Sequence, residues 1–171
     1  MEIQQLHPIF VHFVIAPLVI AVVFDFLWLI KKQDHFEKFS WYSLIIAAIA
    51  GVLSIVSGLI AEENVVFSEI SLEIFESHEL FAFVLIVFLQ IQALWRMGSA
   101  GKIPRKFTYI YFIITIASLT SVIITSYYGG KLVFEHGIGV KSTISVKKEI
   151  KLPEANNKDF QFLKTDTTQN Q

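Results

Sequence analysis

Imidazole side chains are the groups in this chain best suited to bind a metal ion or a haem. The chain has five histidines, and four of them flank long apolar stretches: His7, His12, His78 and His136. A neutral imidazole is tolerated in an apolar setting, and its ring nitrogens are good ligands for iron, copper and zinc. Four histidines gathered on one side of a membrane would predict a shared site. His35 lies in a polar stretch, and we interpret it as solvated.

The composition narrows the chemistry that these histidines can support. The absence of cysteine excludes disulfides, zinc–thiolate sites, iron–sulfur clusters and covalent c-type haem on this chain. No phosphate-binding glycine loop, HExxH or GxSxG motif is present, so whether the chain is an enzyme stays open. Its net charge of -1 gives no case for nucleic-acid binding. Glu62 could add a metal ligand or hold an imidazole N–H, although a solvated carboxylate is the simpler interpretation.

The elements that must position these side chains are four apolar stretches. The chain is 54% hydrophobic and 17% charged, whereas soluble domains carry about 25% charged residues. A membrane-spanning helix needs roughly 20 apolar residues, and three of the four stretches reach that length. We predict an all-α integral membrane antiparallel four-helix bundle over residues 1–140, without an internal repeat, and a largely flexible polar tail over 141–171. The predicted spans cover about residues 8–30, 41–60, 79–96 and 107–128.

The distribution of Lys and Arg predicts the orientation of the bundle. The connections after the first and third stretches are rich in Lys and Arg, whereas residues 61–79 hold six glutamates and neither basic type. The positive-inside rule then places both basic connections in the cytoplasm, and both termini and the acidic connection outside. All four candidate histidines would lie at the outer face. Asp25 would lie near the inner interface, where Lys31 or Lys32 could pair with it.

Two motifs resemble a known family. The opening LHPIFVHFVIA over residues 6–16 resembles the LHPxxVHFPIA of bacterial membrane proteins grouped as domain of unknown function 2231, with Val14 in place of the usual Pro. The Phe24–Asp25 pair and the closing GGKLVFEHG over residues 129–137 also look like that family. The resemblance covers about residues 6–140. It implies a four-helix protein of the bacterial inner membrane, and histidines that match the family positions at His7, His12, His78 and His136.

The leading functional hypothesis is a b-type haem-binding electron-transfer subunit with ligands at the outer face. Of the four histidines we select His12 and His78 as axial ligands, because His12 lies inside the first helix and His78 at the edge of a facing one. His7 and His136 would then support the haem or form a second site. Some relatives are joined to c-type cytochrome domains, so the resemblance implies a c-type cytochrome or another respiratory subunit as partner, besides the lipid bilayer. The alternatives are a Zn, Cu or Fe ion site that includes Glu62, or a non-catalytic subunit of a larger complex.

Overall fold

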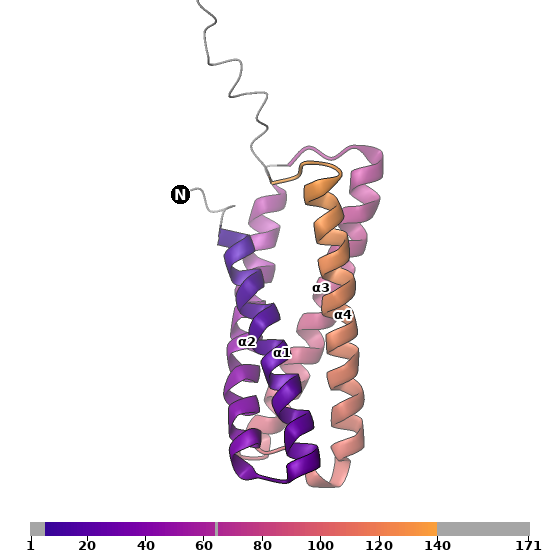
Figure 1. The fold of residues 1–171 in the computed structure, drawn as a ribbon. Helices are drawn as coiled ribbons and strands as arrows, with labels where there is room; N and C mark the ends of the chain where they lie inside the picture. The colour runs from indigo at the N-terminus through magenta and orange to yellow at the C-terminus, as the bar shows by residue number, and fades with distance from the viewer. Residues whose placement is uncertain (1–5, 64, 140–171) are drawn as a thin grey trace, which may run out of the picture. The chain divides into compact units, whose positions relative to one another are not determined.

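The computed structural model describes residues 6–63 and 65–139, which form four long helices (Figure 1). Each helix is long and apolar enough to cross a membrane. The predicted all-α membrane bundle is therefore confirmed, while the predicted tail over 141–171 lies outside the described residues. The elements are α1 (His7–Lys31), α2 (Asp34–Glu62), α3 (Glu69–Gly98), the short 3-10 helix η2 (Arg105–Phe107) and α4 (Thr108–Phe134).

The turn between α1 and α2 is much shorter than the connection of about ten residues that hydropathy indicates. Lys32 closes α1 in the left-handed conformation (φ 54°), and its N–H donates to the carbonyl oxygen of Trp28. α2 begins two residues later at Asp34, with acidic side chains in its first turn that favour a helix N-terminus. Because only Lys32 and Gln33 join them, α1 and α2 must run antiparallel as neighbours.

α3 begins ten residues before the span predicted for it. Ser68 caps the helix: its side chain accepts from the N–H of Ser71, and the Ser71 side chain accepts from the N–H of Ser68 in return. This reciprocal capping satisfies two backbone groups that a helix start leaves unpaired. Hydropathy missed the first turns because glutamates interrupt their apolar residues. The acidic connection therefore shortens to the residues between Glu63 and Ser68.

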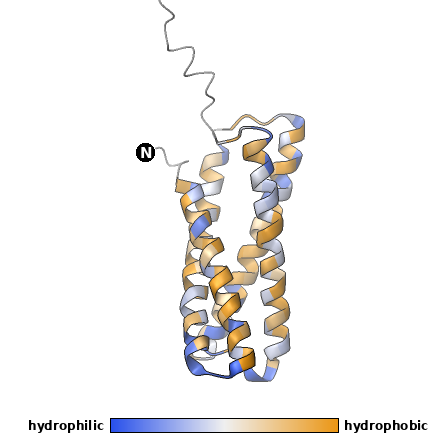
Figure 2. Ribbon diagram, viewed as in Figure 1, coloured by the Kyte–Doolittle hydropathy of each residue, from blue (hydrophilic) through white to orange (hydrophobic). Residues whose placement is uncertain are grey.

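The four helices form two hairpins that pack side by side. α1 packs most extensively on α2, and α3 on α4, while α2 contacts α3 more closely than α1 contacts α4. The end that carries the α2–α3 connection is called the acidic end, and the end with the α1–α2 turn the basic end. Figure 2 shows apolar residues along the middle of all four helices and hydrophilic residues at the basic end. Many outward apolar side chains, such as Ile49 and Ile113, are exposed, as a lipid-facing surface requires.

Many buried positions of the two hairpins correspond, a relation that the prediction of no internal repeat missed. Each residue of the second hairpin lies 71 positions after its equivalent in the first, as Leu89 does after Leu18 and Arg96 after Asp25. The same offset relates Asp34, where α2 begins, to Arg105, where η2 begins. Buried Val14, Leu18, Ala21, Val22 and Asp25 of α1 correspond to buried Leu85, Leu89, Gln92, Ala93 and Arg96 of α3. Buried Ser40, Leu44, Ala47 and Ala50 of α2 correspond to buried Tyr111, Thr115, Ser118 and Ser121 of α4. The repeat is hidden in the sequence because the two halves share burial more than residue identity.

Candidate functional site

His7 opens α1 and turns its ring toward α2. Its Nδ1 lies 3.0 Å from the carbonyl oxygen of Ser54 and 3.2 Å from Oγ of Ser57. A carbonyl oxygen only accepts hydrogen bonds, so the contact with Ser54 assigns the ring proton to Nδ1 and leaves a lone pair on Nε2. The ring packs against Gly58, where an added Cβ would come within 3.1 Å of His7 Cε1. Glycine at this position therefore allows the half-buried imidazole to lie close to α2.

His78 repeats this arrangement in the second hairpin. Its Nδ1 lies 2.9 Å from the carbonyl oxygen of Thr125 in α4, and 47 residues separate the two partners, as they do in the His7–Ser54 contact. The ring packs against Gly129, where an added Cβ would come within 3.1 Å of His78 Cε1. His78 is thus a second half-buried imidazole with its proton on Nδ1 and a lone pair on Nε2.

The two imidazoles, called the histidine pair from here on, belong to different hairpins but lie near each other. They are close enough that a proton on one ring would disfavour a proton on the other. Each is held by its own hairpin through one backbone carbonyl and one glycine. The histidine pair is therefore built from two equivalent halves that meet toward the acidic end of the bundle.

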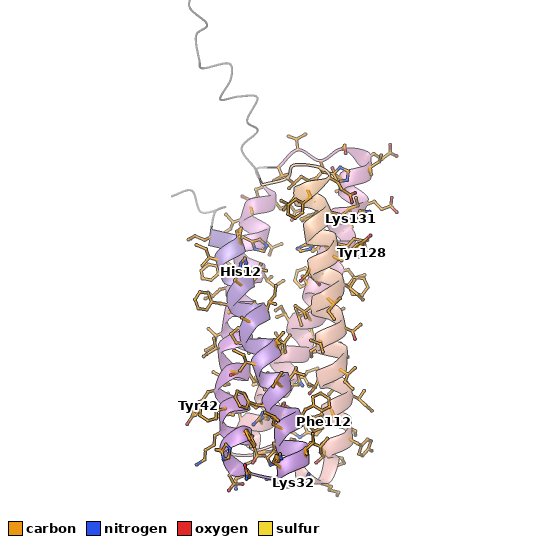
Figure 3. The ribbon with its side chains drawn as sticks, viewed as in Figure 1. His12, Lys32, Tyr42, Phe112, Tyr128 and Lys131 are labelled. Carbon is orange, nitrogen blue, oxygen red and sulfur yellow. The ribbon has the colours of Figure 1, made fainter. Side chains whose placement is uncertain are left out.

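His12 does not join the histidine pair, and its selection as an axial ligand stays a prediction. His12, labelled in Figure 3, is exposed on α1, and its Nδ1 contacts the carbonyl oxygen of Pro8 in the same helix. Five residues of helix rotate a side chain by about 140°. Because α1 already begins at His7 and His7 faces α2, His12 faces away. The structure places His7, rather than His12, beside His78.

The larger metal-ligand set is not assembled in the described part of the chain. Half-buried His136 follows α4, and half-buried Glu62 ends α2, so both lie at the acidic end. Among residues 6–63 and 65–139, no group of three or more His, Cys, Asp or Glu side chains is placed to hold a metal ion. Gly129 and Gly130, which open the GGKLVFEHG motif, lie inside α4.

A second polar cluster, unforeseen from the sequence, lies in the half of the bundle near the basic end. Asp25 Oδ1 is 3.1 Å from Nη1 of Arg96, and both side chains are buried. Tyr111 Oη donates to Asp25 Oδ2 at 2.7 Å, and Ser40 Oγ donates to Asp25 Oδ1. Lys31 and Lys32, the partners expected for Asp25, are exposed instead. The sequence did contain a signal for this ion pair, because Asp25 lies in one apolar stretch and Arg96 at the edge of another. Charges within a membrane usually pair.

Arg96 also ties the connections at the basic end to the bundle. Its Nη2 donates to the carbonyl oxygens of Glu37 (2.7 Å) and Gly101 (2.9 Å). The Glu37 carboxylate accepts from the N–H of Ile103 at 2.7 Å and from Arg105 at 3.1 Å. Buried charges with this many partners are typical of a group that stabilises the fold. A ligand-binding site is therefore better sought at the histidine pair.

Comparison with known proteins gives one match. A family model described as "Predicted membrane protein (DUF2231)" matches residues 4–142, which include all four helices, the histidine pair and the Asp25–Arg96 ion pair. No curated protein and no solved structure matches the chain.

Proposed function

The chain belongs to the DUF2231 family of predicted membrane proteins, and from its histidine pair we propose that it is a membrane-bound b-type haem subunit that transfers electrons. His7 and His78 would be the two axial ligands, one from each hairpin. The observation that carries this proposal is that each imidazole has its proton fixed on Nδ1 by a backbone carbonyl. Both Nε2 lone pairs are therefore left for a ligand.

The surroundings of the histidine pair hold its two rings in place and leave one polar group without a partner. Gly58 and Gly129 lie against the two rings, and a methyl group at either position would crowd the imidazole. Thr125 Oγ1 is buried, and among the described residues it has no hydrogen-bond partner. This hydroxyl could donate to a bound group next to His78. Helix bundles commonly build cofactor sites from side chains of facing helices.

The work of the protein would be to hold and tune the cofactor. A bound haem would supply one-electron chemistry. The carbonyl oxygens of Ser54 and Thr125 fix the orientation of the two rings and make each Nε2 a stronger ligand. Burial between two apolar hairpins limits access of water, which also influences a reduction potential.

The orientation and the partner belong to the same proposal. We place the acidic end outside a bacterial inner membrane, because the basic connections lie at the opposite end. The six glutamates of residues 61–79 would favour a partner with a basic docking face, such as a c-type cytochrome or another respiratory subunit. The lipid bilayer covers the exposed apolar sides of the helices.

The two alternatives are weaker on specific grounds. A zinc site usually needs three or four protein ligands, and the histidine pair supplies two. An Fe or Cu ion would meet the same shortage among the described residues. A role as a non-catalytic subunit of a larger complex would explain the helix bundle. It would not explain why each hairpin holds a histidine by the same kind of carbonyl contact and glycine.

The test is a reduced-minus-oxidised optical spectrum of the full chain, purified in detergent after expression with ample haem. We expect a change in the Soret and α bands in the wild-type protein, and loss of that change in His7→Ala and in His78→Ala. His12→Ala is the matched control, because His12 is exposed on the same helix, and it should keep the wild-type spectrum.

Two results would reject the haem proposal. One is a wild-type protein with no haem absorbance, and the other is haem absorbance that survives both substitutions of the histidine pair. Elemental analysis of the same samples separates the alternatives. Bound metal without porphyrin absorbance favours the ion site, whereas a protein without metal that loses a co-purifying subunit when its histidines are replaced favours the non-catalytic role.

A further inference from the structure

The buried ion pair joins two positions that the internal repeat makes equivalent. Asp25 and Arg96 are separated by 71 positions, the offset that relates the two hairpins, and they contact each other at 3.1 Å. Ser40 and Tyr111 are separated by the same offset, and both bind Asp25 and Arg96. Equivalent positions can meet only where the two hairpins face each other symmetrically. The residues that differ most in charge between the halves therefore lie at the centre of the interface between them.

This placement determines which hairpins can pair favourably. If the α1–α2 hairpin paired with the same hairpin of a second copy, Asp25 would face Asp25. If two α3–α4 hairpins paired, Arg96 would face Arg96. Like charges buried together are unfavourable, because burial removes water and neither charge gains a partner. Only the unlike pairing neutralises both charges.

The rest of the interface offers less discrimination. Several equivalent positions are apolar in both halves, such as Leu18 with Leu89 and Val14 with Leu85, whereas Ala21 corresponds to Gln92 and Leu44 to Thr115. Packing at the positions that are apolar in both halves would be nearly as good between like hairpins as between unlike ones. A membrane gives two copies of the chain a common plane in which such mispairing could occur. Asp25 and Arg96 are the buried equivalent positions at which the two halves carry opposite charges.

We propose that the Asp25–Arg96 pair is a specificity determinant that makes the α1–α2 hairpin pair with the α3–α4 hairpin and excludes pairing of like hairpins between copies. The surrounding contacts support this assignment. Tyr111 donates to Asp25 across the interface, and Arg96 donates to the Glu37 carbonyl oxygen of the other hairpin. Both contacts require unlike partners. The proposal does not depend on a cofactor.

The decisive variant replaces the ion pair by apolar residues, as D25L/R96M, in the full chain in detergent. No charge is left unpaired in this variant, so helix content should stay close to that of the wild type. Thermal stability should fall, because the Glu37 and Gly101 carbonyl oxygens lose their Arg96 donor. Light scattering coupled to size exclusion should show a new population with at least twice the wild-type mass. The control is Q92L/T115V, because Gln92 donates to Thr115 within one hairpin. It removes a buried polar pair and should leave the mass distribution unchanged.

A second variant keeps the test decisive if D25L/R96M does not fold. The exchange D25R/S40Y/R96D/Y111S moves each polar side chain to its equivalent position and rebuilds the same unlike pair from the opposite halves. We expect the wild-type mass for this variant. A wild-type mass distribution for a folded D25L/R96M would overturn the proposal, and so would oligomers or aggregation of the exchange variant.

Discussion

At the scale of single residues, the glycines of the site decide how closely each imidazole can approach a neighbouring helix. Gly129 and Gly130 are adjacent in α4 and differ only in what faces them. An added Cβ at Gly129 would lie 3.1 Å from His78 Cε1, whereas nothing lies within 4 Å of one at Gly130. Glycine in a helix interior costs roughly 0.5–1 kcal/mol relative to alanine. That cost has a structural reason at Gly129 and none in the described part of the chain at Gly130.

These two glycines give a matched pair of variants. Gly130→Ala should raise the free energy of unfolding by about 0.5–1 kcal/mol, because alanine favours the helix. Gly129→Ala should be less stable than Gly130→Ala by about 1 kcal/mol, since the methyl group displaces the His78 ring and weakens its bond to Thr125. Denaturant unfolding in one detergent measures the difference. Equal stabilities for the two variants would contradict the packing role of Gly129.

At the scale of elements, the start of α3 shows a helix boundary set by capping rather than by hydropathy. Ser68 and Ser71 cap each other, and Ser71 is buried. The first two turns of α3 hold glutamates that lower its average hydropathy, so the predicted span begins at residue 79. A helix whose start depends on one cap should be sensitive to loss of that cap.

Ser68→Ala should therefore loosen the beginning of α3 and leave its membrane-spanning part intact. Loss of an N-cap side chain costs about 1 kcal/mol. Amide hydrogens of residues 69–77 should exchange faster in the variant, whereas those of residues 85–96 should not change. Ser77→Ala is the control, because the Ser77 hydroxyl bonds only to the Glu73 carbonyl oxygen within α3. Unchanged exchange in Ser68→Ala would show that tertiary packing alone fixes this boundary.

At the scale of the whole molecule, the asymmetry of charge between the two ends predicts the orientation in the membrane. The α2–α3 connection lies at the acidic end, and the α3–α4 connection lies at the basic end. Val66 in the first connection is 98% exposed, and Ala100 in the second is also exposed. The chain has no cysteine, so single cysteines can be added without background labelling.

Val66→Cys should react with a membrane-impermeant maleimide in intact spheroplasts, whereas Ala100→Cys should react only after the membrane is opened. The physical reason is the positive-inside rule, which keeps the Lys- and Arg-rich connections in the cytoplasm. Labelling of both variants after permeabilisation controls for reactivity. The reverse pattern in intact spheroplasts would invert the orientation and move the histidine pair to the cytoplasmic side.

The sequence by itself determined that the chain spans a membrane four times as an all-α bundle. Those features depend on hydropathy summed over about 20 neighbouring residues, and such a sum changes little when a span is misplaced by a few positions. The same sums misplaced the start of α3 and the first turns of α2, because polar residues at helix ends reduce hydropathy without ending a helix. The LHPIFVHFVIA motif that contains His7 and the GGKLVFEHG motif that contains His136 were also recognisable from the sequence alone.

Only the tertiary structure decided which side chains meet. His7 and His78 come into the same region of the bundle, and Asp25 forms an ion pair with Arg96, each across 71 positions of chain. Each such meeting depends on the rotation of two helices, and one residue turns a side chain by about 100°. A sequence pattern can place His12 and His7 near the same face of the membrane, but it does not say which of them faces the partner hairpin. That choice is made by the Ser54 carbonyl oxygen and Gly58, which receive His7 and leave His12 on the outer surface of α1.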